Sequence, residues 1–265
     1  DDVDGGPIHG AAANAPWRPT RVAPGALTAT RTLSRGRLTA RIVLRDDHPV
    51  LYQTHLLDLD HPCTFAHHPV IRMRGGGRLS TATPSRVLTF DLPGEATRYA
   101  GGQDTDDAHL HMHSGMADWR DYPDAACDDF VALVHSPGLA FTALSRHAEG
   151  DTIVTLKQAA QLPLTGLWIS NGARRIAPWN GRHRGRLGIE DGRFAGADGF
   201  AAALRDAWRR PVPTAFPPGR HVIPHAIVRL AGAHAVEDVA LDGETLVIRT
   251  ELDTSTVPFD AGHFA

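Results

Sequence analysis

The sequence is poor in lysine and cysteine, and each shortage excludes a class of protein. Lys157 is the only lysine, so the 27 basic residues are almost all arginine, an excess that we attribute to genomic composition. The formal net charge is only -3, which predicts no attraction to nucleic acid or to an anionic membrane. Cys63 and Cys127 are the only cysteines, and two lone cysteines indicate reduced, buried thiols better than a disulfide framework.

The chain also lacks long apolar runs. No window is apolar over the roughly 20 residues that a transmembrane helix needs. Residues 1–6 have neither the basic nor the apolar part of a signal peptide, so we expect a cytoplasmic protein. The composition, with 42% hydrophobic and 22% charged residues, is that of a folded chain with a large core. Because no segment resembles a linker, we expect a single domain over residues 1–265.

Short segments that alternate apolar and polar residues recur along the chain. A period of two is typical of strands that bury one face, and the evenly spread 26 glycines and 19 prolines suit turns between them. We predict strands at residues 26–33, 37–44, 50–59, 86–92, 130–135, 140–146, 152–157, 164–170, 221–230 and 245–250.

One segment, residues 199–210, favours a helix. Phe200, Leu204 and Trp208 are spaced four residues apart and would share one helical face, and Pro211 would end the helix. Many strands and one helix predict an all-β sandwich or barrel.

The sequence contains 16 histidines, so position rather than number must identify a functional one. His9 follows a Pro-Ile pair and precedes a glycine on a predicted loop, where a histidine exposed to solvent is the simpler interpretation. His67 and His68 precede Pro69, which favours an extended backbone for His68. Because neighbouring residues on a strand face opposite sides, one of the two histidines should face inward, in either a structural or a catalytic role.

A carboxylate and a run of histidines are further candidates. Glu190 ends an apolar alternation that follows the polar and aromatic residues 178–182, and it is either a surface charge or a buried base. His109, His111 and His113 would face one side of a strand and could hold a divalent metal together with nearby aspartates. The Gly- and Asp-rich surroundings favour a loop instead, on which this alternation has no meaning.

Three of these patterns occur in the same order in one family. The chain resembles the aldose 1-epimerases, or galactose mutarotase-like proteins, and is most similar to the branch that includes the hexose-6-phosphate epimerases. In that family a His-Gly pair precedes a loop and a tryptophan, as His9 and Trp17 do here. A histidine that is often followed by proline comes next, as His68 does, and a much later apolar strand carries a glutamate, as with Glu190.

Weaker similarities extend over residues 6 to about 230. The family often has an aspartate before an apolar strand, which Asp128 or Asp129 would match. Residues 167–171 followed by Trp179 resemble the stretch before the family's glutamate, and residues 216–219 resemble a late turn. Family members have several dozen residues before the His-Gly pair, including a sugar-contacting arginine. This sequence begins almost at that pair, so either the preceding part is missing from this sequence or the domain lacks those first strands.

The resemblance implies a large antiparallel β-sandwich, the galactose mutarotase-like supersandwich, with few short helices. It also implies an isomerase that interconverts the α and β anomers of a hexose or hexose phosphate. Mutarotation needs an acid and a base at one hemiacetal and no electron carrier, so no cofactor is implied. By the same resemblance, Glu190 would take the proton of the C1 hydroxyl and His68 would protonate the ring oxygen. The sugar would be held by His9, Asp128, Asp129, Trp17 and Trp179.

Other functions stay open on the sequence alone. The sandwich could bind a carbohydrate without turning it over, be a metal-dependent β-barrel enzyme that uses the histidine run, or lack a small-molecule site altogether. The expected partner is a small sugar rather than nucleic acid or a membrane, and either a monomer or a homodimer is compatible with the sequence. A sugar phosphate is also left open by arginines near the motifs, namely Arg18, Arg72, Arg74 and Arg182.

Overall fold

The structure is a computed structural model that describes residues 7, 9–92, 96–205, 208–209 and 211–264. Within these residues antiparallel strands predominate, and the α-helices are the short segments Gly10–Asn14 (α1) and Phe200–Ala203 (α2). None of the helices in this described part is long and apolar enough to cross a membrane. Residues 1–6, from which we inferred the lack of a signal peptide, lie outside the described residues.

The larger of the two main sheets has the strand order β1-β2-β3-β4-β17-β14-β13-β7 among the described residues. All its neighbouring strands are antiparallel. The late strand β17 lies between β4 and β14, so the two halves of the chain are joined in one sheet. The strands are Thr20–Ala23 (β1), Ala26–Leu33 (β2), Gly36–Leu44 (β3), Val50–Leu59 (β4), Gly77–Thr81 (β7), Leu139–Arg146 (β13), Asp151–Gln158 (β14) and Gly219–Ala231 (β17).

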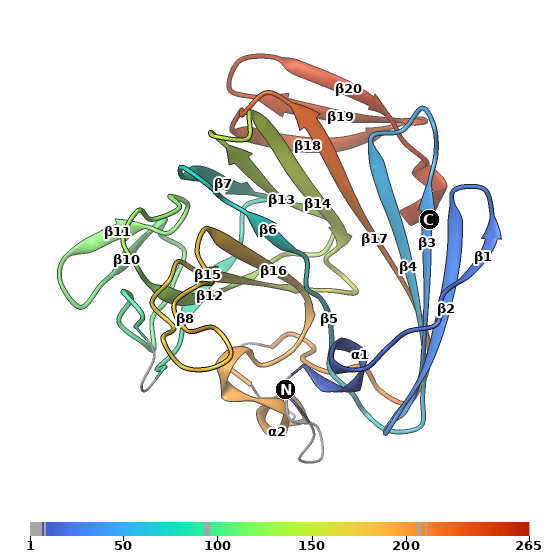
Figure 1. Ribbon diagram of the computed structural model, residues 1–265, viewed down its shortest axis with the longest axis horizontal. Helices are drawn as coiled ribbons and strands as arrows, with labels where there is room; N and C mark the ends of the chain where they lie inside the picture. The colour runs from blue at the N-terminus through green and yellow to red at the C-terminus, as the bar shows by residue number, and fades with distance from the viewer. Residues whose placement is uncertain (1–6, 8, 93–95, 206–207, 210, 265) are drawn as a thin grey trace.

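The second main sheet faces the larger one (Figure 1) and has the order β5-β16-β15-β12-β8-β9. A further short strand, β6, pairs with β16 beyond the end of β5. Strand β5 is therefore at one edge of this sheet. The strands are Phe65–His67 (β5), Val70–Arg72 (β6), Arg86–Thr89 (β8), Asp104–Thr105 (β9), Asp128–Val134 (β12), Leu164–Ser170 (β15) and Arg186–Arg193 (β16).

Smaller elements cover the two main sheets. The sheet of Val236–Asp242 (β18), Thr245–Thr250 (β19) and Thr254–Pro258 (β20) lies over one end of the larger sheet (Figure 1). Its Leu246 and Ile248 pack with Phe141 and Val154 on the outer face of that sheet. The hairpin of His109–His111 (β10) and Met116–Asp118 (β11) is on the side of the second sheet (Figure 1). The 3-10 helices are Gly196–Asp198 and Ala261–Phe264.

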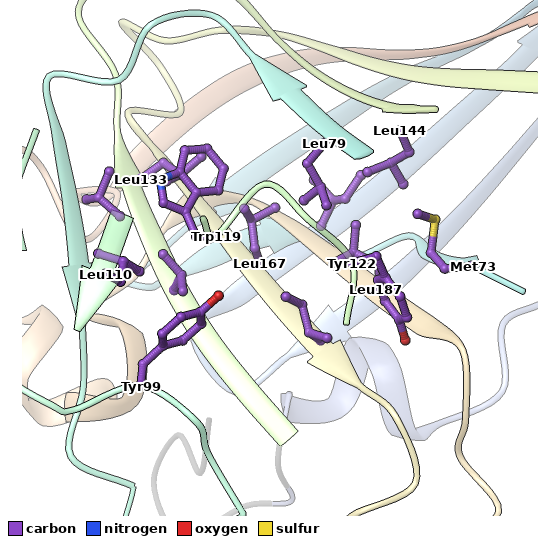
Figure 2. Packing of buried hydrophobic residues seen from close by; sticks show 14 of the residues in the cluster. Met73, Leu79, Tyr99, Leu110, Trp119, Tyr122, Leu133, Leu144, Leu167 and Leu187 are labelled. Carbon is purple, nitrogen blue, oxygen red and sulfur yellow. The ribbon is translucent and has the colours of Figure 1, made fainter. Parts of the chain in front are cut away.

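The main core lies between the two large sheets. Figure 2 shows a cluster that contains Leu144 of β13 in the larger sheet together with Leu167 of β15, Leu187 of β16, Leu133 and Trp119. All five side chains are buried, and burying one large apolar side chain stabilises the fold by about 1.5–3 kcal/mol. The inward position of Leu187 and Ile189 fixes which face of β16 each later residue occupies, because strand side chains alternate.

The all-β prediction is confirmed, and most predicted strands are present. The bounds of β2, β4, β15 and β19 coincide with the predicted ones, and the other predicted strands differ by one to three residues at one or both ends. These strands were predictable because each buries one face and so shows the period of two. The strands β1, β5 to β7, β9 to β11, β18 and β20 were not predicted, and β16 was expected only from the resemblance, which implies an apolar strand before Glu190.

The predicted helix over residues 199–210 is wrong beyond Ala203, where α2 ends. The hydroxyl of Thr214 donates to the Ala203 carbonyl oxygen at 2.6 Å and so takes an acceptor that a longer helix would use. Trp208 and Arg209 instead donate to the carboxylate of Asp198, at 3.0 and 2.9 Å. These tertiary contacts override the local apolar spacing, while residues 206, 207 and 210 of the predicted helix lie outside the described residues.

A buried polar cluster crosses the core between the two sheets. The carboxylate of Asp191 on β16 lies 3.0 Å from Nζ of Lys157 on β14 and 3.1 Å from Nε2 of His225 on β17. Thr165 of β15 donates its hydroxyl to the same carboxylate at 2.7 Å. Burial opposes the charge, but the Lys157 cation and the hydrogen bonds from His225 and Thr165 hold the pKa of Asp191 well below its usual range. Asp191 therefore stays ionised and connects four strands.

We expect Lys157→Met to lower the free energy of unfolding by about 3–5 kcal/mol, because it leaves the buried Asp191 carboxylate without its cation. Urea unfolding followed by circular dichroism would measure the change. Arg220→Met is the matched control, since Arg220 is an exposed residue 3.9 Å from Asp58 and should contribute less than about 1 kcal/mol. Equal losses for the two variants would contradict the role assigned to Lys157.

Candidate active site

The pairing of β16 with two successive short strands brings His68 and Glu190 together. Asp191 pairs with His67 of β5, and Gly188 pairs with Val70 of β6, so His68 lies opposite Glu190 between the two paired segments. The imidazole Nε2 of His68 is 3.2 Å from Oε1 of Glu190. Two side chains that are far apart in the sequence thus meet at hydrogen-bonding distance.

The alternation of strand side chains separates these two residues from their neighbours. Asp191 and His67 face the core between the sheets, so Glu190 and His68 face the outer side of the second sheet. The side chains of His68 and Glu190 remain 22% and 18% exposed, whereas those of His67 and Asp191 are buried. The outer pair is therefore accessible to a ligand.

Small residues make room for the His68 ring. A Cβ atom at Gly188 would lie 2.7 Å from Cε1 of His68, closer than side chains tolerate. A Cβ atom at Gly166, which pairs with Glu190, would lie 3.1 Å from Cβ of Glu190. Trp168 borders the same face, with its ring centroid 6.1 Å from that of His68 at an interplanar angle of 88°. Local sequence patterns do not indicate these steric roles, because they depend on which strands are neighbours.

His9 joins this pair from the start of α1. Its backbone has a φ of 63°, a left-handed conformation that is uncommon for a residue other than glycine. Its ring is edge-on to that of His68, with centroids 5.1 Å apart. Burial and the neighbouring His68 lower the pKa of His9, although Glu190 opposes the shift. His9 therefore offers a neutral imidazole beside His68 and Glu190 at neutral pH.

A cavity of about 690 Å³ contains this site. His9, His68, Glu190 and Trp168 line it at one end, and Trp17 forms part of the wall. The indole Nε1 of Trp17 donates to the Ala12 carbonyl oxygen at 2.8 Å, which fixes the ring orientation. Four of the seven residues predicted from the sequence for catalysis or sugar binding therefore line one cavity: His9, Trp17, His68 and Glu190.

Comparison with known proteins supports the fold. No protein-family model and no curated protein sequence matches the chain. The Slr1438 protein of Synechocystis sp. is similar in structure, with a TM-score of 0.54 and 13% identity over 84% of this chain and 68% of that protein. A galactose mutarotase-related enzyme from Lactobacillus acidophilus has a TM-score of 0.53 and 12% identity over 88% of this chain and 76% of its own. The chain has the galactose mutarotase-like fold.

A third similar structure, from Klebsiella pneumoniae, is provisionally assigned as an aldose 1-epimerase. Its TM-score is 0.51 at 12% identity, over 85% of this chain and 57% of that protein. At such low identities, these likenesses establish the fold and leave the activity to be argued from the site.

In this galactose mutarotase-like fold, the other predicted sugar ligands lie outside the cavity lining. Asp128 is only 2% exposed and accepts hydrogen bonds from Nε1 of Trp168 at 2.8 Å and from the Ser170 hydroxyl at 3.1 Å. Nη2 of Arg174 lies 3.0 Å from the same carboxylate, and this guanidinium covers the Trp179 ring at 4.6 Å. Asp128 thus orients Trp168, and sugar contacts by Asp128 and Trp179 remain predictions.

Asp129 is likewise engaged within the protein. Its side chain is fully buried and accepts hydrogen bonds from the backbone N–H and from Nε of Arg98, both at 2.7 Å. A role for Asp129 in sugar binding also remains a prediction.

The histidine run lies on the hairpin of β10 and β11 in this galactose mutarotase-like fold. His109 and His111 are exposed on β10, and Nδ1 of His109 lies 3.4 Å from the Asp107 carboxylate. Among the residues that the structure describes, no three or more histidine, cysteine or acidic side chains are arranged to hold a metal ion.

We expect stability to fall as the pH is lowered from about 6.5 to 4, because three buried histidines are neutral in the folded state. Burial and nearby charges lower the pKa of His55 to about 4, that of His135 to about 3 and that of His67 well below its usual range. In this window the unfolded chain binds more protons than the folded chain, so each such histidine removes about 1.4 kcal/mol of stability per pH unit.

Urea unfolding at pH 7.5, 6, 5 and 4.5 would measure this slope. His55→Gln should reduce the number of protons taken up on unfolding by about one, and so reduce the slope of stability against pH. His147→Gln, at a histidine in the loop after β13, should leave the slope unchanged. A free energy of unfolding that is constant between pH 6.5 and 4.5 would contradict the prediction.

Proposed function

We propose that this chain is an aldose 1-epimerase-like isomerase that interconverts the α and β anomers of a sugar by opening its ring. The 3.2 Å contact between His68 and Glu190 at one end of a cavity is the observation that carries this proposal. Such an acid–base pair is what mutarotation needs, because one proton must leave the C1 hydroxyl while another reaches the ring oxygen.

In the proposed reaction, the hemiacetal of the sugar binds between His68 and Glu190 and replaces their direct contact. The Glu190 carboxylate removes the proton of the C1 hydroxyl as His68 donates a proton to the ring oxygen, and the bond between C1 and the ring oxygen breaks. The aldehyde at C1 then rotates about the C1–C2 bond. Ring closure on the opposite face returns both protons and gives the other anomer, so the protein ends in its starting state.

Two neighbouring side chains support this assignment. His9 is neutral and lies edge-on to His68, so it can hydrogen-bond the sugar near the ring oxygen without adding charge. Trp168 is held by its hydrogen bond to Asp128 and borders the His68 ring. An indole that is fixed in this way limits the rotation of the imidazole.

We expect Glu190→Gln to reduce anomer exchange by about 10²- to 10⁴-fold, because an amide cannot accept the C1 proton. Polarimetry on freshly dissolved α-D-glucose and α-D-galactose, corrected for the rate in buffer, would measure the loss. Glu149→Gln is the matched control, since Glu149 pairs with Arg74 and does not line the cavity. Unchanged exchange by Glu190→Gln would remove Glu190 from the base role, and sugar binding without exchange by the native chain would favour a non-catalytic carbohydrate-binding protein.

A further inference from the structure

The cavity continues past the acid–base pair to the other face of the second sheet. Glu190 and His68 line it on the outer face, while Phe65 and His67 of β5 and Arg193 of β16 line it on the inner face. Strand β5 is the edge strand of its sheet. The cavity therefore extends around this edge into the space between the two main sheets.

The part of the cavity between the sheets, which we call the inner chamber, has apolar walls. Leu33, Leu38, Leu57 and Leu59 come from β2 to β4 of the larger sheet, and Trp17 and Phe65 complete the walls. Leu38 and Leu57 are register partners, so their side chains lie next to each other on one face. These walls favour an apolar group over a hydroxylated ring.

Two imidazoles at the inner end of this chamber have unused nitrogen atoms. His67 is 6% exposed, and its Nε2 has no hydrogen-bond partner among the described residues, although its ring stacks on that of His225 at 4.0 Å. Nδ1 of His55 is also buried without a partner in this part of the chain, and the His55 and His67 ring centroids are 4.7 Å apart. Since buried polar groups are normally hydrogen-bonded, this pair indicates a place for a polar atom of a ligand.

The two arginines that line the described cavity each make contacts within the protein. Nε of Arg193 donates to the Gln161 carbonyl oxygen at 2.8 Å, and its guanidinium lies 4.2 Å from the Phe216 ring centroid. Arg35 donates to the Pro62 carbonyl oxygen at 3.2 Å and lies 4.9 Å from the Phe200 ring centroid. A sugar phosphate was considered as substrate because arginines occur near the sequence motifs. None of these arginines lines the cavity: Arg18, Arg72, Arg74 and Arg182. These contacts disfavour a phosphate and favour an uncharged ligand.

The cavity is also larger than a free hexose requires. A 150 Å³ cavity holds benzene, so the 12 heavy atoms of a hexose need about 300 Å³ on the same scale. About half of the 690 Å³ is then left for another part of the ligand.

Resting on the epimerase function proposed above, we propose that the inner chamber is a specificity subsite for an uncharged apolar substituent of the sugar. The preferred substrate is then a neutral aldose that carries an aryl or acyl group remote from C1. An oxygen of that group accepts or donates a hydrogen bond at the His55–His67 end.

Three sugars with a free anomeric centre test this subsite: D-glucose, D-glucose 6-phosphate and 6-O-benzoyl-D-glucose. We expect kcat/KM for the benzoyl sugar to exceed that for glucose at least tenfold, mainly through a lower KM, and the phosphate to give no gain. In the Leu33→Trp variant the added ring occupies the chamber, so the ratio of kcat/KM for the benzoyl sugar to kcat/KM for glucose should fall toward one. Leu33→Phe should give an intermediate ratio. Leu44→Trp is the control, because Leu44 is an exposed leucine of β3 outside the cavity and its variant should keep the full preference.

Calorimetric titration of the Glu190→Gln variant with the same sugars separates this proposal from the proposed activity. At least tenfold tighter binding of the benzoyl sugar than of glucose, lost with an added Leu33→Trp substitution, would support the subsite even if the native chain exchanges no anomers. Equal affinities for glucose and the benzoyl sugar, a preference for the phosphate, or no binding of any of the three would overturn it.

Discussion

The buried contact between Asp191 and Lys157 is the constraint on which the rest of the structure depends. It joins β16 of one main sheet to β14 of the other, and His225 and Thr165 add β17 and β15 to the same carboxylate. A charge buried in this way is tolerated only when its partners are in place, so a shift of β16 by one residue would be costly. The pairing of β16 with β5 and β6, and thus the position of Glu190 opposite His68, depends on this fixed register.

The same two dipeptides carry both the structural and the proposed chemical groups. His67 and Asp191 face the core, whereas their neighbours His68 and Glu190 face the cavity, because side chains alternate along a strand. This arrangement places the proposed acid–base pair where β16 pairs with β5 and β6. It also joins the proposed function to the stability of the core, since a change that moves His67 or Asp191 also moves the neighbouring member of the pair.

Three of the imidazoles that line the cavity are polar but uncharged at neutral pH. His9, His55 and His67 have lowered pKa values because they are buried, and at neutral pH they offer hydrogen bonds without attracting ions. Trp168 is held in place by Asp128, which the sequence suggested as a sugar ligand and which the structure shows in a supporting contact. The galactose mutarotase-like fold supplies the frame, while the arguments for chemistry and for ligand preference come from these side chains.

The sequence by itself determined the all-β class, the bounds of strands such as β2 and β4, and, through its resemblance to one family, the candidates His9, His68 and Glu190. Those features were accessible because one-sided burial leaves a period of two in each strand, and because the order of the motifs along the chain can be compared directly. Only the tertiary structure decided the short extent of α2, the steric role of Gly188 and the cavity around the edge of β5. Each of these depends on contacts between segments distant in sequence, which local patterns do not encode.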